Sequence, residues 1–193
     1  MEITTDIIKQ LREMTGVSVM QCKKALEEVG GDLKQAEVIL KKHSAEAAAK
    51  KSERSLKAGA IGSYTHEGAI GAMVALSCET DFVAKNLEFV ALARELAMQV
   101  AATDPSYGSV AEIPSSARDA ATAVFEKEIS DKPKDMQEKI LEGKLSSYFQ
   151  DQVLLEQPFI KDESKKVSDL INEATQKFGE RIEISRFARV SIR

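Results

Sequence analysis

Three stretches within the first 45 residues carry apolar side chains at every third or fourth position, which is the spacing of one face of a helix. The first stretch ends at Gly16, the second runs from Ser18 to Gly30, and the third begins at Asp32, so each boundary carries a typical helix cap. The pattern predicts a three-helix unit over residues 1–45. Its inward positions are Ile7, Ile8, Leu11, Cys22, Ala25, Leu26, Val29, Leu33, Ala36, Ile39 and Leu40.

The pattern changes after this unit. Residues 46–58 are rich in alanine and charge but lack a stripe of large apolar residues, so we interpret them as a linker that is helical or flexible. Two strand-like runs follow on either side of the polar turn at residues 66–68, which predicts a β-hairpin. One face of the second run is apolar and should be covered by helices. That face consists of Ile70, Ala72, Val74, Leu76 and Cys78.

The remaining chain is mostly helical by pattern. Asn86 caps a predicted helix over residues 87–103, and further helices are predicted near residues 115–130, 135–156 and 164–179. The apolar stripe of the first of these helices contains Phe89, Val90, Ala93, Leu96, Ala97 and Val100.

The last segment, residues 181–192, alternates as a strand does. The alternation places Ile182, Ile184, Ala188, Val190 and Ile192 inward and Arg181, Glu183, Ser185 and Arg189 outward. Residues 59–193 are therefore predicted to form an α+β core, in which helices pack on a three-stranded antiparallel sheet.

Composition restricts the class of protein. The chain has 193 residues, of which 43% are hydrophobic and 30% charged, and this balance is typical of a folded globular protein. A net charge of −4 argues against a nucleic-acid-binding domain, which usually presents a basic face. Because the chain lacks an apolar run of about 20 residues and a signal-peptide pattern at its start, we expect a cytoplasmic protein that does not enter a membrane.

Candidate catalytic chemistry is sparse. The two cysteines, Cys22 and Cys78, are far apart and form no metal-binding pattern, so we expect reduced packing residues. His43 and His66 have no nucleophile or metal partner nearby in sequence, and the Gly-Lys pair at 143–144 lacks the rest of a phosphate-binding loop. We therefore expect no enzyme, no cofactor and no metal site, and protein binding is the favoured function.

One short stretch, Ser77 to Asn86, raises a structural question. It places Asp81 and Phe82 where the chain leaves a buried strand and enters a helix. Phe82 could fold back into the core, or it could be presented to a partner. The turn at residues 16–20, which contains Val17, Val19 and Met20, is a second place where apolar residues gather between helices.

Three separated stretches resemble the elongation factor Ts family, and the resemblance spans essentially the whole chain. The first is LREMTGVSVMQCKKALEEVGGDLKQAEVIL (residues 11–40), the second CETDFVAKN (78–86) and the third LLEQPFIKDESKKVSDLI (154–171). The resemblance implies a ubiquitin-associated-like N-terminal domain and an α+β core. It also implies an activity, which is guanine-nucleotide exchange on the translational GTPase elongation factor Tu.

The resemblance assigns roles to particular residues. The family's TDFV motif, which enters the GTPase domain near its magnesium site, corresponds here to Thr80, Asp81, Phe82 and Val83. A second contact of the family, at the turn after the first helix, corresponds to Arg12, Val19 and Met20. Many relatives have glycine, methionine and aspartate where this chain has Ser18, Val19 and Gln21, so the second contact is expected to be weaker or reshaped.

The resemblance also bears on assembly. Full-length relatives carry two copies of the core, whereas this chain has room for one, so a homodimer is expected to form a two-plus-two complex with elongation factor Tu, in its GDP-bound and nucleotide-free forms. The competing hypothesis is a ubiquitin-associated-like adaptor that binds proteins without exchange activity. That hypothesis accounts for the N-terminal domain alone.

Overall fold

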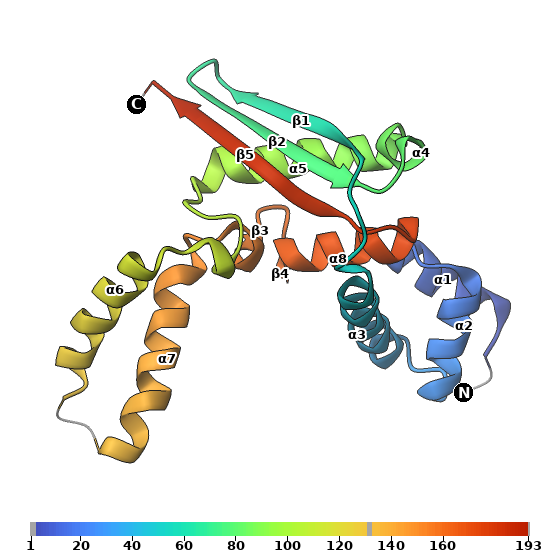
Figure 1. Cartoon of the computed structure of the whole chain (residues 1–193). Coiled ribbons are helices and arrows are strands. Elements are labelled where there is room, and N and C mark those ends of the chain that lie inside the picture. The colour runs from blue at the N-terminus through green and yellow to red at the C-terminus, as the bar shows by residue number, and fades with distance from the viewer. Residues whose placement is uncertain (1–2, 131–132, 193) are drawn as a thin grey trace.

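The computed structural model describes residues 3–130 and 133–192, so the outer limits of the predicted domains, residues 1 and 193, lie outside the described residues. Figure 1 shows an N-terminal helical module at one end, a helical hairpin at the other end, and a sheet with its helices between them. Within the described ranges, no helix is both long enough and apolar enough to span a membrane.

The N-terminal module consists of α1 (Thr5–Thr15), α2 (Val19–Glu28) and α3 (Leu33–Lys51). Each helix begins at a side-chain cap, because Thr4, Ser18 and Asp32 each accept a hydrogen bond from the backbone three residues further on. The predicted three-helix module is confirmed, and α3 continues through the first residues of the predicted linker. The core of the module contains Ile8, Leu11, Val17, Cys22, Ala25, Leu26, Ala36 and Leu40.

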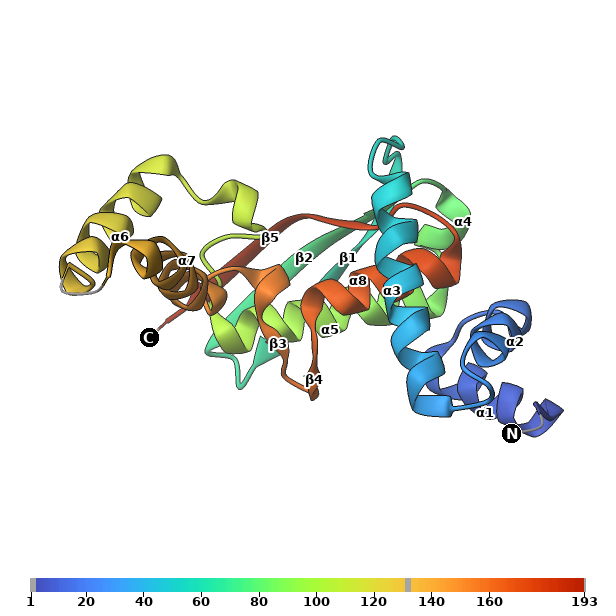
Figure 2. The ribbon, with the colours of Figure 1, turned by 90° about the horizontal axis from the view of Figure 1, so that it is seen from below.

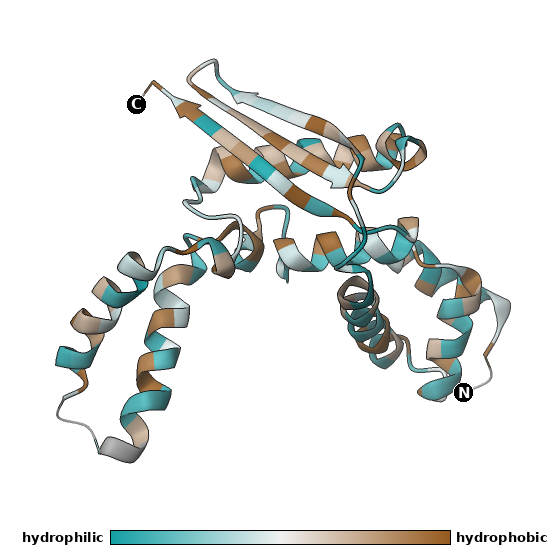
Figure 3. Cartoon of the chain, viewed as in Figure 1, coloured by the Kyte–Doolittle hydropathy of each residue, from teal (hydrophilic) through white to brown (hydrophobic). Residues whose placement is uncertain are grey.

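The sheet has three antiparallel strands in the order β1 (Ala58–His66), β2 (Ile70–Cys78) and β5 (Glu183–Ser191). Helices α5 (Leu87–Thr103) and α8 (Val167–Phe178) share a core with its inner face, and Figure 3 shows how apolar residues concentrate on β2 and α5. The predicted α+β fold class is therefore confirmed. The apolar face predicted for β2 is also correct, since Ala72, Val74, Leu76 and Cys78 are buried.

The alternation predicted for the last strand is wrong in its second half. Strand β5 pairs Ile184 with Leu76 and Arg186 with Ala75, so Ser185 is an extra residue, a β-bulge. One extra residue moves every following side chain of the strand to the other face of the sheet. Three residues predicted to lie inward, Ala188, Val190 and Ile192, are therefore exposed. Arg189, predicted to lie outward, is mostly buried and donates hydrogen bonds to the Ala101 carbonyl oxygen and to Asp104.

A helical hairpin of α6 (Ser115–Glu128) and α7 (Lys134–Gln150) projects from the core, as both ribbon views show (Figures 1 and 2). It has a small core of Ile113, Ala121, Phe149 and Val153.

Two of the predicted helices differ in length from the observed ones. The predicted helix 135–156 ends early and is followed by a 3-10 turn, η2 (Leu154–Glu156). A second such turn, η1 (Val110–Glu112), precedes α6. The predicted helix 164–179 begins late because β4 (Asp162–Lys166) pairs with β3 (Pro158–Phe159).

The N-terminal module is joined to the core by packing of α3 against α8. The Lys51 ammonium donates to the Thr175 carbonyl oxygen at 3.2 Å, and Ser44, which is buried, donates to the side chain of Gln176. Both contacts are partly buried. They join α3 of the module directly to α8 of the core.

Gly62 allows α5 to lie directly on β1. A Cβ atom at this position would be 2.0 Å from the Ala93 carbonyl oxygen. We therefore predict that Gly62→Ala lowers the free energy of unfolding by about 1–3 kcal/mol, the usual cost of overpacking. Urea unfolding measures this loss. The control is Gly71→Ala, whose new atom would meet only the Thr65 methyl group at 3.9 Å and should cost less than about 0.5 kcal/mol; equal losses in both variants would contradict the packing argument.

Candidate functional site

The candidate site begins where β2 ends, at the buried thiol of Cys78. The thiol donates to the Thr80 carbonyl oxygen at 3.3 Å, and burial, followed by the nearby Glu180 carboxylate, raises its pKa. A protonated, buried thiol is a packing group and not a nucleophile. Cys78 therefore anchors the end of the strand, and the predicted motif residues come directly after it.

The next residues form a helix of a single turn, α4 (Asp81–Ala84). Thr80 caps it, because its hydroxyl oxygen accepts from the Val83 backbone N–H at 3.5 Å. Val83 is 4% exposed and packs in the main core, whereas Phe82 is 85% exposed. Neighbouring residues of a helix point in directions about 100° apart, and in α4 Val83 points inward while Phe82 points outward. The interpretation of Phe82 as a core residue is therefore wrong.

The other residues of the motif are also accessible. The carboxylate of Asp81 lies 3.9 Å from the Lys85 ammonium, and both side chains are largely exposed, so this pair contributes little to stability. Thr80 and Asp81, the two residues before Phe82, are thus both exposed. The structure places three of the four predicted motif residues at the surface and uses Val83 as the anchor.

Leu87 is an exposed apolar residue that the sequence patterns did not single out. It is the first residue of α5 and is 85% exposed. Val90, which was predicted to lie in the inward stripe of this helix, is also exposed. Phe82, Leu87 and Val90 are thus three exposed apolar side chains within residues 82–90. In the sequence, Leu87 could have been recognised because it lies outside the apolar stripe predicted for residues 89–100.

Charged groups hold the segment next to α4. The Glu79 carboxylate accepts from the Arg181 backbone N–H at 2.6 Å and from the Arg54 guanidinium at 3.2 Å. These hydrogen bonds, the backbone one first, favour the ionised form and lower the pKa of Glu79. The Arg181 guanidinium in turn donates to the Arg54 carbonyl oxygen at 2.7 Å. The end of β2, the start of β5 and the segment before β1 are thus joined at one point.

The second predicted contact is also exposed. Val17 is buried and anchors the turn between α1 and α2, while Val19 and Met20 project from the first turn of α2. Arg12 lies on the exposed side of α1, and Met14, which sequence reasoning missed, is exposed beside the turn. Figures 1 and 2 show α4 and the α1–α2 turn at the same end of the molecule, opposite the hairpin.

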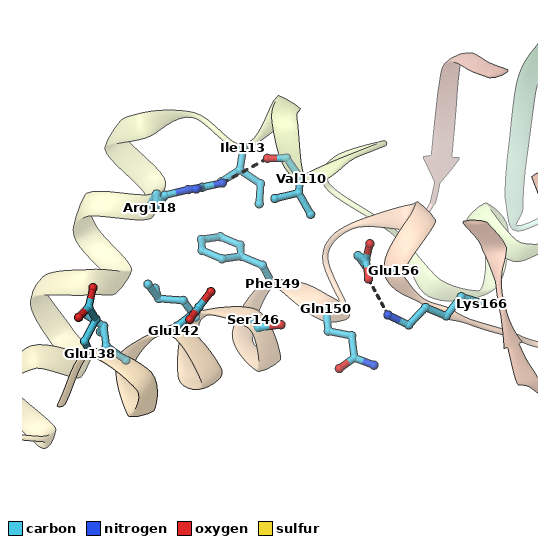
Figure 4. A pocket seen from close by; sticks show the side chains of 12 residues that line it. Val110, Ile113, Arg118, Glu138, Glu142, Ser146, Phe149, Gln150, Glu156 and Lys166 are labelled. Carbon is cyan, nitrogen blue, oxygen red and sulfur yellow. Dashed lines mark hydrogen bonds and ion pairs between the residues drawn. The ribbon is translucent and has the colours of Figure 1, made fainter. Parts of the chain in front are cut away.

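A cavity of about 520 Å³ lies elsewhere, between η1 and the hairpin helices. Figure 4 shows the Phe149 ring beside Ile113 and Val110, with Arg118 donating to the Val110 carbonyl oxygen at 3.4 Å. The residues lining it do not include any predicted site residue. Among the described residues, no cluster of three or more histidine, cysteine, aspartate or glutamate side chains is suited to hold a metal ion.

The contrast between two phenylalanines tests the site as described. Phe82→Ala should change the free energy of unfolding by less than about 0.5 kcal/mol, because the ring is already in solvent. Phe89→Ala is the matched control and should cost about 3–5 kcal/mol, because that ring is 0% exposed and packs edge-on against Phe178. Urea unfolding of both variants measures the difference. A large loss for Phe82→Ala would show that its ring packs within its own chain.

Comparison with known proteins identifies the family. A family model described as Elongation factor TS matches residues 4–193. Among curated proteins, the chain is 49% identical to an elongation factor Ts of Thermotoga petrophila over 100% of this chain and 97% of the relative. It is 46% identical to one of Thermodesulfovibrio yellowstonii, with the same coverage, and 42% identical to one of Coprothermobacter proteolyticus over 98% of each chain. The chain therefore belongs to the elongation factor Ts family.

Proposed function

We propose that this chain is a guanine-nucleotide exchange factor for the translational GTPase elongation factor Tu. The observation that carries the proposal is the exposure of Phe82 on a capped single-turn helix, at the position of the family's TDFV motif. A large apolar side chain held in water gains free energy when a partner covers it. Membership of the family points to elongation factor Tu as the partner, and in this proposal the Phe82 ring is the side chain that contacts it.

Phe82 acts as a wedge in this proposal. Burial of one phenylalanine side chain contributes about 1.5–3 kcal/mol, which is enough to hold apart two packed elements of the partner. The Asp81 carboxylate lies beside the ring and competes for polar groups around the partner's magnesium site. Displacement of the elements that hold the ion leaves the charge of the diphosphate less neutralised, so GDP dissociates faster. No covalent bond is made or broken.

Thermodynamic linkage explains how binding of the factor promotes nucleotide exchange. A factor that binds the nucleotide-free GTPase more tightly than the nucleotide-bound GTPase must weaken nucleotide binding by the same ratio. Each tenfold change corresponds to about 1.4 kcal/mol, so one well-buried aromatic ring supplies one to two factors of ten. The second contact, at Arg12, Val19 and Met20, adds affinity. Because valine is shorter than methionine, Val19 contributes less area there than the usual residue of the family.

Dimerisation completes the proposed assembly. The outer face of the sheet is open and apolar along its centre, where the register pairs Met73 of β2 with Ser63 and Ala188 and places Ile61 next to Ala75. Ile61, Met73 and Val190 are exposed there. An apolar sheet face commonly packs on a second sheet, and the related chains that contain two copies of the core favour a second copy of this chain as the occupant.

Stimulated release of a fluorescent GDP analogue from elongation factor Tu tests the wedge. Phe82→Ala should lower the apparent second-order rate constant of release by about 10-fold or more, since about 1.5–3 kcal/mol of burial is lost. Val124→Ala is the control, because Val124 is an equally apolar, exposed residue on the distant hairpin helix α6. The proposed function is wrong if the unaltered chain fails to stimulate release. An adaptor without exchange activity would give that result while still binding the GTPase.

Sedimentation at micromolar concentration tests the dimer. We expect a dimer for the unaltered chain and a monomer for Met73→Glu, because a carboxylate at the centre of the sheet face would have to be desolvated in the interface. Val124→Glu places the same charge on the hairpin and should leave the dimer intact. A monomeric unaltered chain, or a dimeric Met73→Glu variant, would contradict the proposed interface.

A further inference from the structure

The turn that carries Phe82 is held by Glu180. This residue lies just before β5, the strand that pairs with β2. One oxygen of its carboxylate accepts from the backbone N–H groups of Glu79 and Thr80, both at 3.0 Å. The other oxygen accepts from the Thr80 hydroxyl at 2.6 Å. Three hydrogen bonds to one carboxylate are strong because the acceptor is charged. They fix the backbone and the side chain of Thr80 together.

The Thr80 hydroxyl links this carboxylate to the helix that carries Phe82. A hydroxyl has one proton to donate and lone pairs that accept. Because the proton is directed to Glu180, a lone pair is left to accept from the Val83 N–H at 3.5 Å, which is the cap of α4. Glu180 therefore orients the cap as well as the chain that leads into it. An isolated helical turn has little stability of its own, so α4 depends on these external contacts.

Glu180 is itself supported by a well-packed frame. It follows Gly179, which ends α8 in the left-handed conformation at φ 73°, and it precedes Ile182, which is buried in the main core. The helix before it is anchored in the same core by Val167, Ile171 and Ala174. The contact is also reciprocal, because Glu79 accepts from the backbone of Arg181, the residue after Glu180. A carboxylate of each segment thus accepts hydrogen bonds from the backbone of the other segment.

We propose that Glu180 is a positioning residue for nucleotide exchange, which it serves by holding α4 in the orientation that presents Phe82 to the GTPase. This inference rests on the proposed function. Glu180 does not need to touch the partner. A side chain that is already held in its bound orientation loses less conformational entropy on binding, so the wedge acts at lower concentrations of the factor.

The test compares three variants in two assays. Glu180→Ala removes all three hydrogen bonds, whereas Glu180→Gln keeps an oxygen that accepts from both backbone N–H groups. Glu112→Ala is the matched control, because the Glu112 carboxylate similarly accepts from the Gly108 N–H and the Ser109 hydroxyl, both at 3.1 Å, in a turn at the base of the hairpin. The first assay is stimulated release of a fluorescent GDP analogue from elongation factor Tu. The second is amide hydrogen exchange of the free protein.

We expect Glu180→Ala to lower the apparent second-order rate constant of stimulated release by about tenfold, a change of about 1.4 kcal/mol. Its amide exchange should be faster within residues 79–86 and unchanged elsewhere. Glu180→Gln should recover most of the rate, and Glu112→Ala should retain all of it even if its unfolding midpoint falls as far as that of Glu180→Ala.

Two results would overturn the positioning role. One is a Glu180→Ala variant that stimulates release as well as the unaltered chain, which would leave the proposed function standing. The other is a variant whose loss of rate is matched by Glu112→Ala, because the effect would then reflect general destabilisation. Absence of stimulation by the unaltered chain would instead reject the proposed function, and the positioning role with it.

Discussion

A helix of one turn can direct few side chains into the core, and this constraint determines how the site is built. In α4 the buried residue is Val83, and its neighbour Phe82 faces solvent. Exposure of a phenylalanine costs the free protein the free energy of its burial. Because folded proteins are only marginally stable, the surrounding sheet and helices have to offset that cost, and the same free energy becomes available when a partner covers the ring.

The fold makes this exposed ring a fixed feature of the surface. Strand β2 ends in the core at Cys78, and α8 ends at Gly179 close to the same point, where the carboxylates of Glu79 and Glu180 each accept from the other segment's backbone. The packing of α3 on α8 attaches the N-terminal module to this frame. The two surfaces assigned to partner binding therefore belong to one body, in which a shift of α8 would move both.

Sequence patterns predicted those parts of the fold that depend on local chemistry. Caps at Ser18 and Asp32 placed the second and third helices, and strict alternation gave the buried face of β2. The bulge at Ser185 could not be predicted in this way, because it arises from pairing with β2 and leaves no mark in the local pattern. Its consequence is that Val190 lies on the open face of the sheet. The β3–β4 pair was missed for the same reason.

The candidate site was predicted in part. The motif residues Thr80 to Val83 followed from the resemblance, whereas the sequence pattern alone left open whether Phe82 is buried or exposed. Leu87 was missed because periodicity identifies inward residues and says little about an isolated apolar residue at a helix start. Glu180 could not be found from local sequence, because its partners are far away in the chain.

We propose that the Phe82 ring enters the GTPase beside its magnesium site. Photo-crosslinking with p-benzoylphenylalanine in place of Phe82 tests this placement, since the benzophenone reacts only with groups that it touches. We expect crosslinks to the GTPase domain of elongation factor Tu, in the segments that surround the magnesium ion. Crosslinks to another domain of the partner, or only within the factor itself, would contradict it.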